Sequence, residues 1–323
     1  MSIPQFGRKA TLIVSRPEVA GNNPSAFVPA ANLDLSAFHF TFKTVQQDVE
    51  SPNNCAIRIY NLSKETAQTL SKGEFSKVVL QAGYEKAYGV IFAGTIKQFR
   101  VGRESATTTF LDLLAADGDI AYNNSVVNKT LAAGSTPADR VGVAVDAMKP
   151  NGVVPGSLMP FTGGILPRGK VLFGMARATI RAEAESQGAT WNINNGALNI
   201  VPLQGYLPGE PVELSASTGM VGIPEQTNEG LLVKCLLNPR IVVGGLVKID
   251  NKSVNQLVAS SANPFNLAYN SNTGGPLRLA TITNDGLYRV FVAEHTGDVR
   301  GREWYTNLVC LAVDTSTKKV VAQ

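Results

Sequence analysis

The 323-residue sequence has few of the side chains that most often carry out catalysis, with two histidines and three cysteines. Cys55, Cys235 and Cys310 are odd in number, and each lies within an apolar run that is typical of a strand. These positions predict buried, reduced thiols in a protein made in a reducing cytoplasm. A chain of this length buries about three quarters of its unfolded surface, so it needs neither disulfides nor a metal to be stable.

Charge is scarce as well. Charged residues make up 17% of the chain, compared with roughly 25% in an average soluble protein. The formal net charge is +4 and no block of five basic residues occurs, which argues against nucleic-acid binding. Together with 30 glycines and 17 prolines, this composition predicts many short strands and turns, with part of the surface covered by other subunits.

Targeting and membrane-spanning segments are also missing from the pattern. Residues 1–9 lack the apolar core of a signal peptide. The most apolar run, from Gly230 to Val247, is interrupted by Lys234, Pro239 and Arg240, which argues against a membrane span. We therefore expect a soluble cytoplasmic product.

Residues 1–128 alternate apolar and polar side chains in the manner of half-buried strands. We expect strands over residues 8–15, 38–42, 55–59, 77–84, 89–101 and 105–114. Ser63 is placed to cap a short helix that has Glu65 in its first turn. About six strands with one short helix predict a β-barrel or a sandwich with closed edges.

A small α/β module is expected over residues 129–204. Thr136-Pro-Ala-Asp139 predicts a capping box with proline at the first helical position. A second helix is expected from about Val171 to Gln187, with a glycine directly after it. Asn195-Gly196 then predicts a tight hairpin between strands at 189–194 and 197–203.

Residues 205–323 return to strand patterns. We expect strands at 231–237, 241–249 and 277–282, with part helix and part loop over 251–276. Two further strands bury alternate side chains, namely Tyr288, Val290 and Val292 on the first and Trp304, Thr306, Leu308 and Cys310 on the second. A polar loop from Glu294 to Glu303 would join them, with Gly297 and Gly301 where the chain turns tightly.

One segment nearly matches a phosphate-binding loop. Residues 164–171 read Gly-Ile-Leu-Pro-Arg-Gly-Lys-Val, close to G-x-x-x-x-G-K-[ST]. Val171 has no hydroxyl to hold magnesium, and Pro167 removes a backbone N–H from the cradle. No apolar strand leads directly into Gly164, so we interpret the segment as a glycine-rich loop before a helix.

His295 is the strongest candidate for catalysis, since Glu294 and Asp298 lie beside it. A metal site would need three or four ligands at a defined spacing, and the other histidine, His39, lies between phenylalanines on an expected strand. We therefore interpret His295 as part of a polar hairpin loop and expect no cofactor, no metal and no enzymatic activity. A triad assembled in space stays open, although no G-x-S-x-G motif occurs.

Three segments carry a resemblance to a known family. They are Ile57-Arg-Ile-Tyr-Asn-Leu-Ser with Leu80-Gln-Ala-Gly-Tyr and Ile91-Phe-Ala-Gly-Thr-Ile, then Gly219-Met-Val-Gly-Ile-Pro-Glu-Gln-Thr with residues 230–239, and finally Asp285-Gly-Leu-Tyr with residues 295–304. In this order, over nearly the whole chain, the sequence resembles the baseplate hub proteins of contractile-tailed bacteriophages. The shared features are strands and turns, and none is an active-site signature.

The resemblance implies a mainly β fold with two tube-like β-barrel domains, at 1–128 and 205–323, flanking the helix–hairpin module at 129–204. It implies a homotrimeric ring in the virion tail baseplate that joins a six-fold tail tube to a three-fold central spike. Implied partners are the spike, the tube or a tube-initiator protein, and possible tape-measure and wedge proteins. Phage DNA would pass through the lumen without specific recognition, and the spike would be released after sheath contraction.

Related secretion-system spike proteins fuse the hub to a further barrel and a β-prism. This sequence has no such repeat, so the spike is expected to be a separate protein. The alternatives are a tail enzyme that degrades the cell wall, for which 25 acidic residues always supply two carboxylates, and a receptor-binding tail protein. For an oligomer or partner interface we select the residues of the last polar loop and its flanks, His295, Asp298, Arg300, Arg302 and Trp304, although for the arginine pair taken alone a solvated turn is the preferred interpretation.

Overall fold

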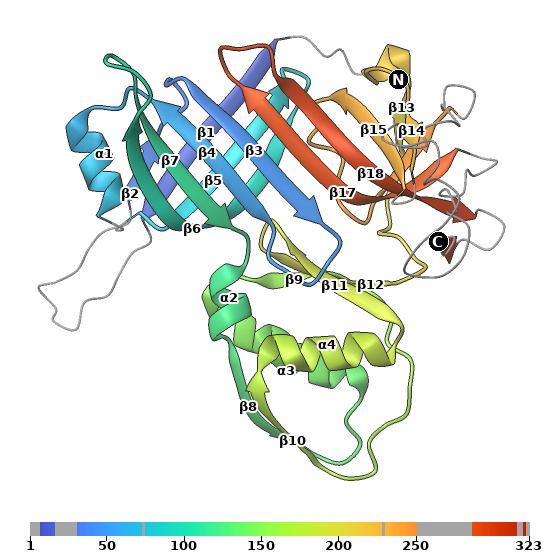
Figure 1. The fold of residues 1–323 in the computed structure, drawn as a ribbon. Helices are drawn as coiled ribbons and strands as arrows, with labels where there is room; N and C mark the ends of the chain where they lie inside the picture. Colours follow the sequence, from blue (N-terminus) through green and yellow to red (C-terminus); the bar gives the residue numbers. More distant parts are fainter. Residues whose placement is uncertain are drawn as a thin grey trace, which may run out of the picture.

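The computed structural model describes residues 7–16, 31–72, 75–227, 230–250, 286–314 and 319–320 (Figure 1). The expected strand at 277–282 and the segment 251–276 lie outside these ranges. Most of the described chain is strand, and the largest sheet is antiparallel along nearly its whole length. No described helix is both long and apolar enough to cross a membrane.

The first β-rich part consists of seven strands and one short helix. They are β1 (Arg8–Arg16), β2 (Ala31–Asp34), β3 (Phe40–Gln47), β4 (Asn54–Tyr60), α1 (Lys64–Ser71), β5 (Lys77–Tyr84), β6 (Ala87–Arg103) and β7 (Thr109–Ala116). The expected alternation is confirmed, because Phe40, Phe42, Ile57 and Ile59 point into one hydrophobic core. The hydroxyl of Ser63 accepts the Thr66 N–H, so the predicted helix cap is confirmed too.

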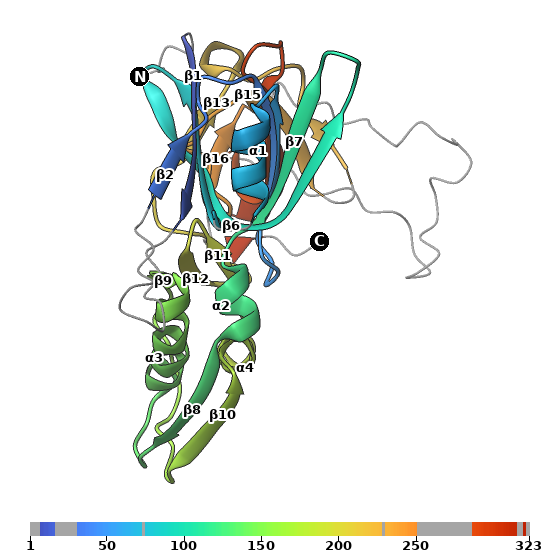
Figure 2. The ribbon, with the colours of Figure 1, turned by 90° about the vertical axis from the view of Figure 1, so that its left-hand side faces the viewer.

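The module projects from one end of the long sheet (Figures 1 and 2). Its elements are α2 (Asp119–Asn124), β8 (Val126–Leu131), α3 (Pro137–Met148), β9 (Val154–Leu158), β10 (Lys170–Met175), α4 (Ala176–Ser186), β11 (Ala189–Asn194) and β12 (Ala197–Pro202), with a 3-10 turn, η1, at Lys149–Asn151. Thr136 and Asp139 form the predicted capping box. Asn195 and Gly196 both have positive φ angles, as a two-residue hairpin turn requires.

The prediction of one helix from about Val171 to Gln187 was wrong in its first part. Residues Lys170–Met175 form strand β10, which pairs with β8, and the helix α4 begins only at Ala176. Val171 and Phe173 face outward while Leu172 is buried between them. This period of two is typical of a strand. In the sequence it runs directly into the apolar stripe of a helix, and the two together look like one longer helix.

The last part adds β13 (Val212–Leu214), a 3-10 turn η2 (Ala216–Thr218), β14 (Glu225–Gln226), β15 (Leu231–Leu236), β16 (Leu246–Ile249), β17 (Leu287–Asp298), β18 (Trp304–Asp314) and β19 (Lys319–Val320). The strand expected at 241–249 is shorter than predicted, because residues 241–245 lie outside it and include a turn at 243–244. Cys55, Cys235 and Cys310 are free and buried, as predicted. Burial raises the pKa of the Cys235 thiol to about 12, so it stays protonated.

The two β-rich parts form one continuous sheet. Strand β17 pairs antiparallel with β3 through seven residue pairs, from Val292↔Gln47 to Asp298↔Thr41. The strand order is therefore β14-β15-β18-β17-β3-β4-β7-β6-β5-β1-β2, with β13, β16 and β19 off this path. The core of the first part also contains Leu237 and Trp304 from the last part. The domain boundaries at 128 and 204 stay a prediction.

A β-bulge in β17 decides which side chains the last hairpin buries. The register with β18 shifts between Val290 and Val292, so Phe291 is the extra residue. Tyr288 and Val290 are buried before the bulge, and Ala293 and His295 are buried after it. A one-residue bulge exchanges the two faces of a strand. The prediction that Val292 belongs to the inward face was therefore wrong, because it is only half-buried.

Candidate functional site: a candidate assembly surface

A buried polar junction fixes the module to the sheet. At its centre the Asp48 carboxylate pairs with the Arg289 guanidinium, and both side chains are at most 3% exposed. Asp48 also accepts a hydrogen bond of 2.7 Å from the Asn192 amide. Arg289 donates to the backbone carbonyls of residues 202, 203 and 205, at 3.3, 3.0 and 2.7 Å. Three segments far apart in the sequence meet at this one ion pair.

The turn between β3 and β4 completes the junction. The Asn53 amide donates to the Ile193 carbonyl at 2.9 Å, and its oxygen accepts the Gln47 N–H. The Asp117 carboxylate accepts the Gly196 N–H at 2.9 Å. Because most of these contacts join the module to strand β17 or to turns that follow the strands of the sheet, the junction holds the module in one orientation.

The β17–β18 hairpin ends in a turn that is fastened on both sides. Asp298 accepts the N–H groups of Arg300 and Gly301 at 2.9 and 2.8 Å, and it pairs with His39 Nε2 at 2.8 Å. The pKa of Asp298 is lowered, because these hydrogen bonds outweigh its partial burial. From the other side, the Arg8 guanidinium donates to the carbonyls of Gly301 and Arg302 and lies 5.7 Å from the Trp304 ring centroid.

The five residues selected from the sequence thus separate into two groups. Arg300 and Arg302 are exposed at the tip of the hairpin, and Asp298 is half-buried beneath them. His295 and Trp304 are each 1% exposed within the single chain. The predicted loop from Glu294 to Glu303 was wrong for residues 294–298, which belong to β17. The interface role of the five residues stays a prediction, and only the two arginines among them are exposed.

His295 is a core residue in this structure. Its Nδ1 lies 2.9 Å from the hydroxyl of Thr306, which is also buried. Burial lowers the His295 pKa to about 4, so the ring is neutral at physiological pH. Glu294 points to the opposite face, where it pairs with Lys43 at 2.8 Å. Successive side chains of a strand point to opposite faces, so the acid and the imidazole that are neighbours in the sequence do not meet, and the bulge at Phe291 decides that the imidazole is the one that is buried.

Of the two glycines expected in a tight turn, Gly301 lies in the turn between β17 and β18, and Gly297 does not. Gly297 lies within β17, and a Cβ atom there would lie 2.3 Å from Cζ of Phe42. Gly301 would place a Cβ atom 2.3 Å from a carboxylate oxygen of Asp298. Neither residue has a positive φ angle. Close approach of neighbouring side chains, and not a left-handed turn, is what requires glycine at both positions.

The outward face of the long sheet carries charges that are already paired. Lys43 pairs with Glu294, and Arg58 pairs with Asp112 at 2.7 Å. Lys234 lies 4.2 Å from the ring centroid of Tyr305. These contacts are spread across β15, β18, β17, β3, β4 and β7, and ion pairing balances the charges of Lys43 and Arg58 on this face. No group of three or more His, Cys, Asp or Glu that could hold a metal lies within the described ranges.

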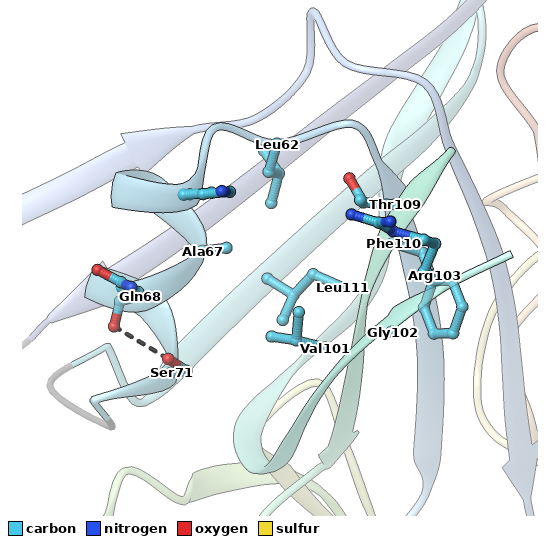
Figure 3. Close-up of a pocket in the computed structure, with 11 residues that line it drawn as sticks. Leu62, Ala67, Gln68, Ser71, Val101, Gly102, Arg103, Thr109, Phe110 and Leu111 are labelled. Carbon is cyan, nitrogen blue, oxygen red and sulfur yellow. Dashed lines mark hydrogen bonds between the residues drawn. The ribbon is translucent and has the colours of Figure 1, made fainter. Parts of the chain in front are cut away.

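An apolar groove lies beside this face, between α1 and the β6–β7 hairpin (Figure 3). Its volume is about 420 Å³, and its floor is formed by Leu62, Ala67, Val101, Phe110 and Leu111. None of these residues belongs to the interface predicted from the sequence. Val101 lies on the outward side of an expected strand, and a single exposed apolar residue on a strand is too common to indicate a site.

Comparison with known proteins connects this fold to tail proteins. No protein-family model matches the sequence, and no curated protein matches it. The structure is similar to the 43 kDa tail protein of prophage MuSo2 from Shewanella oneidensis, with a TM-score of 0.54 and 7% identity over 94% of this chain and 98% of that one. It is also similar to a tail protein from Neisseria meningitidis MC58, with a TM-score of 0.53 and 10% identity over 94% and 96%.

A third solved structure has the same fold. It is an E. coli component of the type VI secretion system that is similar in structure to the T4 bacteriophage tail proteins gp27 and gp5. The TM-score is 0.54 and the identity is 9%, over 88% of this chain and 76% of that one. At such low identity the likeness shows a shared fold. The predicted fold class, mainly β with an α/β insert, is confirmed.

Proposed function

We propose that this chain is a structural virion protein that forms the hub of a phage tail baseplate as a homotrimeric ring. The observation that carries the proposal is the pairing of β3 with β17, which joins two β-rich parts into one antiparallel sheet within a single chain. Three such chains present six β-rich units around one axis. That number matches a six-fold tail tube, while the three-fold symmetry of the ring matches a central spike.

The similar structures support the same role. Two are tail proteins, and the third is a secretion-system component that is similar to phage tail proteins. The paired charges on the outward face fit a lumen wall, because DNA must slide past such a surface without binding it. In this proposal the partners are the spike, the tail tube or its initiator, and the neighbouring tape-measure and wedge proteins, and the chain acts by geometry and not by catalysis.

The mass of the purified protein in solution tests the proposal. Light scattering should give three times the chain mass of 34.3 kDa, either for the protein alone or after addition of the central spike protein of the same phage. A protein that stays monomeric in both conditions would overturn the ring. Release of fragments from purified peptidoglycan by that monomer would favour a cell-wall-degrading enzyme, and binding to host cells would favour a receptor-binding protein.

A further inference from the structure

The groove between α1 and the β6–β7 hairpin is preformed. The Asn61 amide oxygen accepts the Thr109 N–H at 3.0 Å, and the Asn61 N–H donates to the Thr109 carbonyl at 2.9 Å, which ties the start of α1 to β7. Figure 3 shows Leu62 and Ala67 on the helix side and Val101 and Leu111 on the strand side of the same space. Val101 is 59% exposed, so part of this apolar floor faces solvent.

The rim of the groove is basic. Lys64 and Arg103 line it and are exposed, and its described lining contains no Asp or Glu. Arg58 lies 4.0 Å from the ring centroid of Phe110, another lining residue, but it is paired with Asp112 and Glu104, so the positive charge of the rim rests on Lys64 and Arg103. An apolar floor with a positive rim fits a protein segment that carries an apolar side chain next to a carboxylate.

The same chain presents such a segment at residues 221–225, Val-Gly-Ile-Pro-Glu. Ile223 is 64% exposed and Val221 is 37% exposed, and Glu225 is exposed at the start of β14. The segment is held against strand β15, since the Val221 N–H donates to the Lys234 carbonyl at 2.8 Å. Residues 205–230 contain four glutamates and neither lysine nor arginine, so the whole surrounding segment is acidic.

The groove and the acidic segment lie on opposite sides of the molecule. In Figure 1, α1 and the β6–β7 hairpin lie at one side of the sheet and β14 lies at the other. In the strand order, β14 is one end of the path, while β7 and β6 lie beyond β3 and β4. Within one chain the two surfaces therefore cannot meet. Between copies they would form a heterologous, head-to-tail contact, the type that closes into a ring.

We propose that the segment Val221–Glu225 of one copy binds in the groove between α1 and the β6–β7 hairpin of the next copy. Ile223 would fill the apolar floor at Val101 and Phe110, and Glu225 would pair with Arg103 or Lys64 on the rim. The inference rests on the proposed ring and names its interface. Both surfaces are already ordered in the single chain, so little conformational entropy is lost when they meet.

Disulfide trapping tests the contact. The native cysteines are buried, so a new pair, Val101→Cys with Ile223→Cys in one chain, should be the reactive one. Mild oxidation should give a covalent species of three chains in a denaturing, non-reducing gel. Each single variant should stay monomeric on that gel, while an equal mixture of the two should give a dimer. The matched control is Val101→Cys with Phe173→Cys, since Phe173 is 79% exposed on the module.

The outcomes separate this inference from the proposed ring. A covalent trimer from the 101–223 pair supports both. A protein that is trimeric by light scattering but forms no 101–223 link overturns the groove contact and leaves the ring intact. If the control pair 101–173 forms a link and the 101–223 pair does not, the module of a neighbouring copy occupies the groove. That result also overturns the proposed groove contact. A monomer without any link overturns both.

Charge exchange supplies a second measurement that does not depend on disulfide geometry. Arg103→Glu and Glu225→Arg should each lower the trimer fraction at a fixed concentration at least threefold, because each places like charges together. The double variant, in which the two charges are exchanged, should recover the trimer fraction of the wild type. Both side chains are exposed, so the melting temperature of each variant should match that of the wild type. Equal trimer fractions in all four proteins would overturn the proposed pairing.

Discussion

The carboxylate of Asp48 and the guanidinium of Arg289 form a buried ion pair across 241 positions of the sequence. Asp48 lies directly after β3, and Arg289 lies near the start of β17. The same two side chains also bind the module, through Asn192 and the carbonyls that follow β12. In the proposed hub, this pair makes the sheet and the module one rigid body.

Removing one partner should therefore be costly. We expect Asp48→Ala to lower the free energy of unfolding by about 3–5 kcal/mol, because it leaves the Arg289 charge buried without its counter-ion. Urea unfolding at pH 7 measures the change. The matched control is Glu50→Ala, which breaks the more exposed pair between Glu50 and Arg181 close by, and its expected cost is at most about 1 kcal/mol. Equal costs for both variants would show that the junction does not depend on this ion pair.

Two glycine substitutions should have opposite effects. Gly297→Ala brings a methyl group against the ring of Phe42, and we expect it to lower the free energy of unfolding by about 1–3 kcal/mol. Gly142→Ala lies in α3 with open space around the new methyl group, and should raise it by about 0.5–1 kcal/mol. Thermal and urea unfolding of both variants test this difference. A neutral Gly297→Ala would mean that the Phe42 ring can move away from the new methyl group at no cost.

Local signals in the sequence predicted most of the fold. The capping box at Thr136, the Asn195-Gly196 turn and the inward face of β18 depend on neighbours within a few residues, and all three are confirmed. Such features are set by backbone geometry and side-chain period. The burial of the three cysteines was predictable for the same reason, since each lies on an alternating apolar face.

Features that depend on partners distant in the sequence were not predictable. The bulge at Phe291 reflects how β17 fits between β18 and β3, and nothing in the local sequence marks it. The junction joins Asp48, Asn192 and Arg289, which lie in three separate regions of the sequence. The groove depends on how α1 packs against β6 and β7. In each case tertiary packing, and not local propensity, decides the result.

The burial of His295 predicts a pH dependence of stability. Its pKa is about 4 in the folded chain and about 6.5 when unfolded, so between these values the unfolded chain binds the extra proton. The contribution of the neutral His295 ring to the free energy of unfolding is therefore complete above pH 6.5 and is lost as the pH falls toward 4. We expect wild type to lose about 2–3 kcal/mol relative to His295→Gln between pH 7.5 and 4.5. Urea unfolding of both proteins at the two pH values measures the difference, and a constant difference would contradict a buried, neutral imidazole.

Asp117 should give the opposite dependence. Its carboxyl is 1% exposed, and burial raises its pKa to about 7 despite the hydrogen bond from the Gly196 N–H. Between pH 4 and 7 the folded chain binds the extra proton at Asp117. The stabilisation of the fold by the protonated carboxyl is therefore complete below pH 4 and is lost as the pH rises through 7. Asp117→Asn keeps an oxygen for the Gly196 N–H and cannot ionise.

We therefore expect the free energy of unfolding of Asp117→Asn to rise relative to that of wild type by on the order of 3 kcal/mol between pH 4 and 8. Urea unfolding of both proteins measures this change. Asp119→Asn is the control, because its carboxylate pairs with Lys97 at the surface and should change stability by less than about 1 kcal/mol. Because Asp117 belongs to the junction, the same series shows whether the module loosens from the sheet before the whole chain unfolds. Loss of module protection alone at pH 8, in hydrogen exchange, would mean that ionisation of Asp117 weakens the junction locally. Identical pH profiles of wild type and Asp117→Asn would contradict the raised pKa.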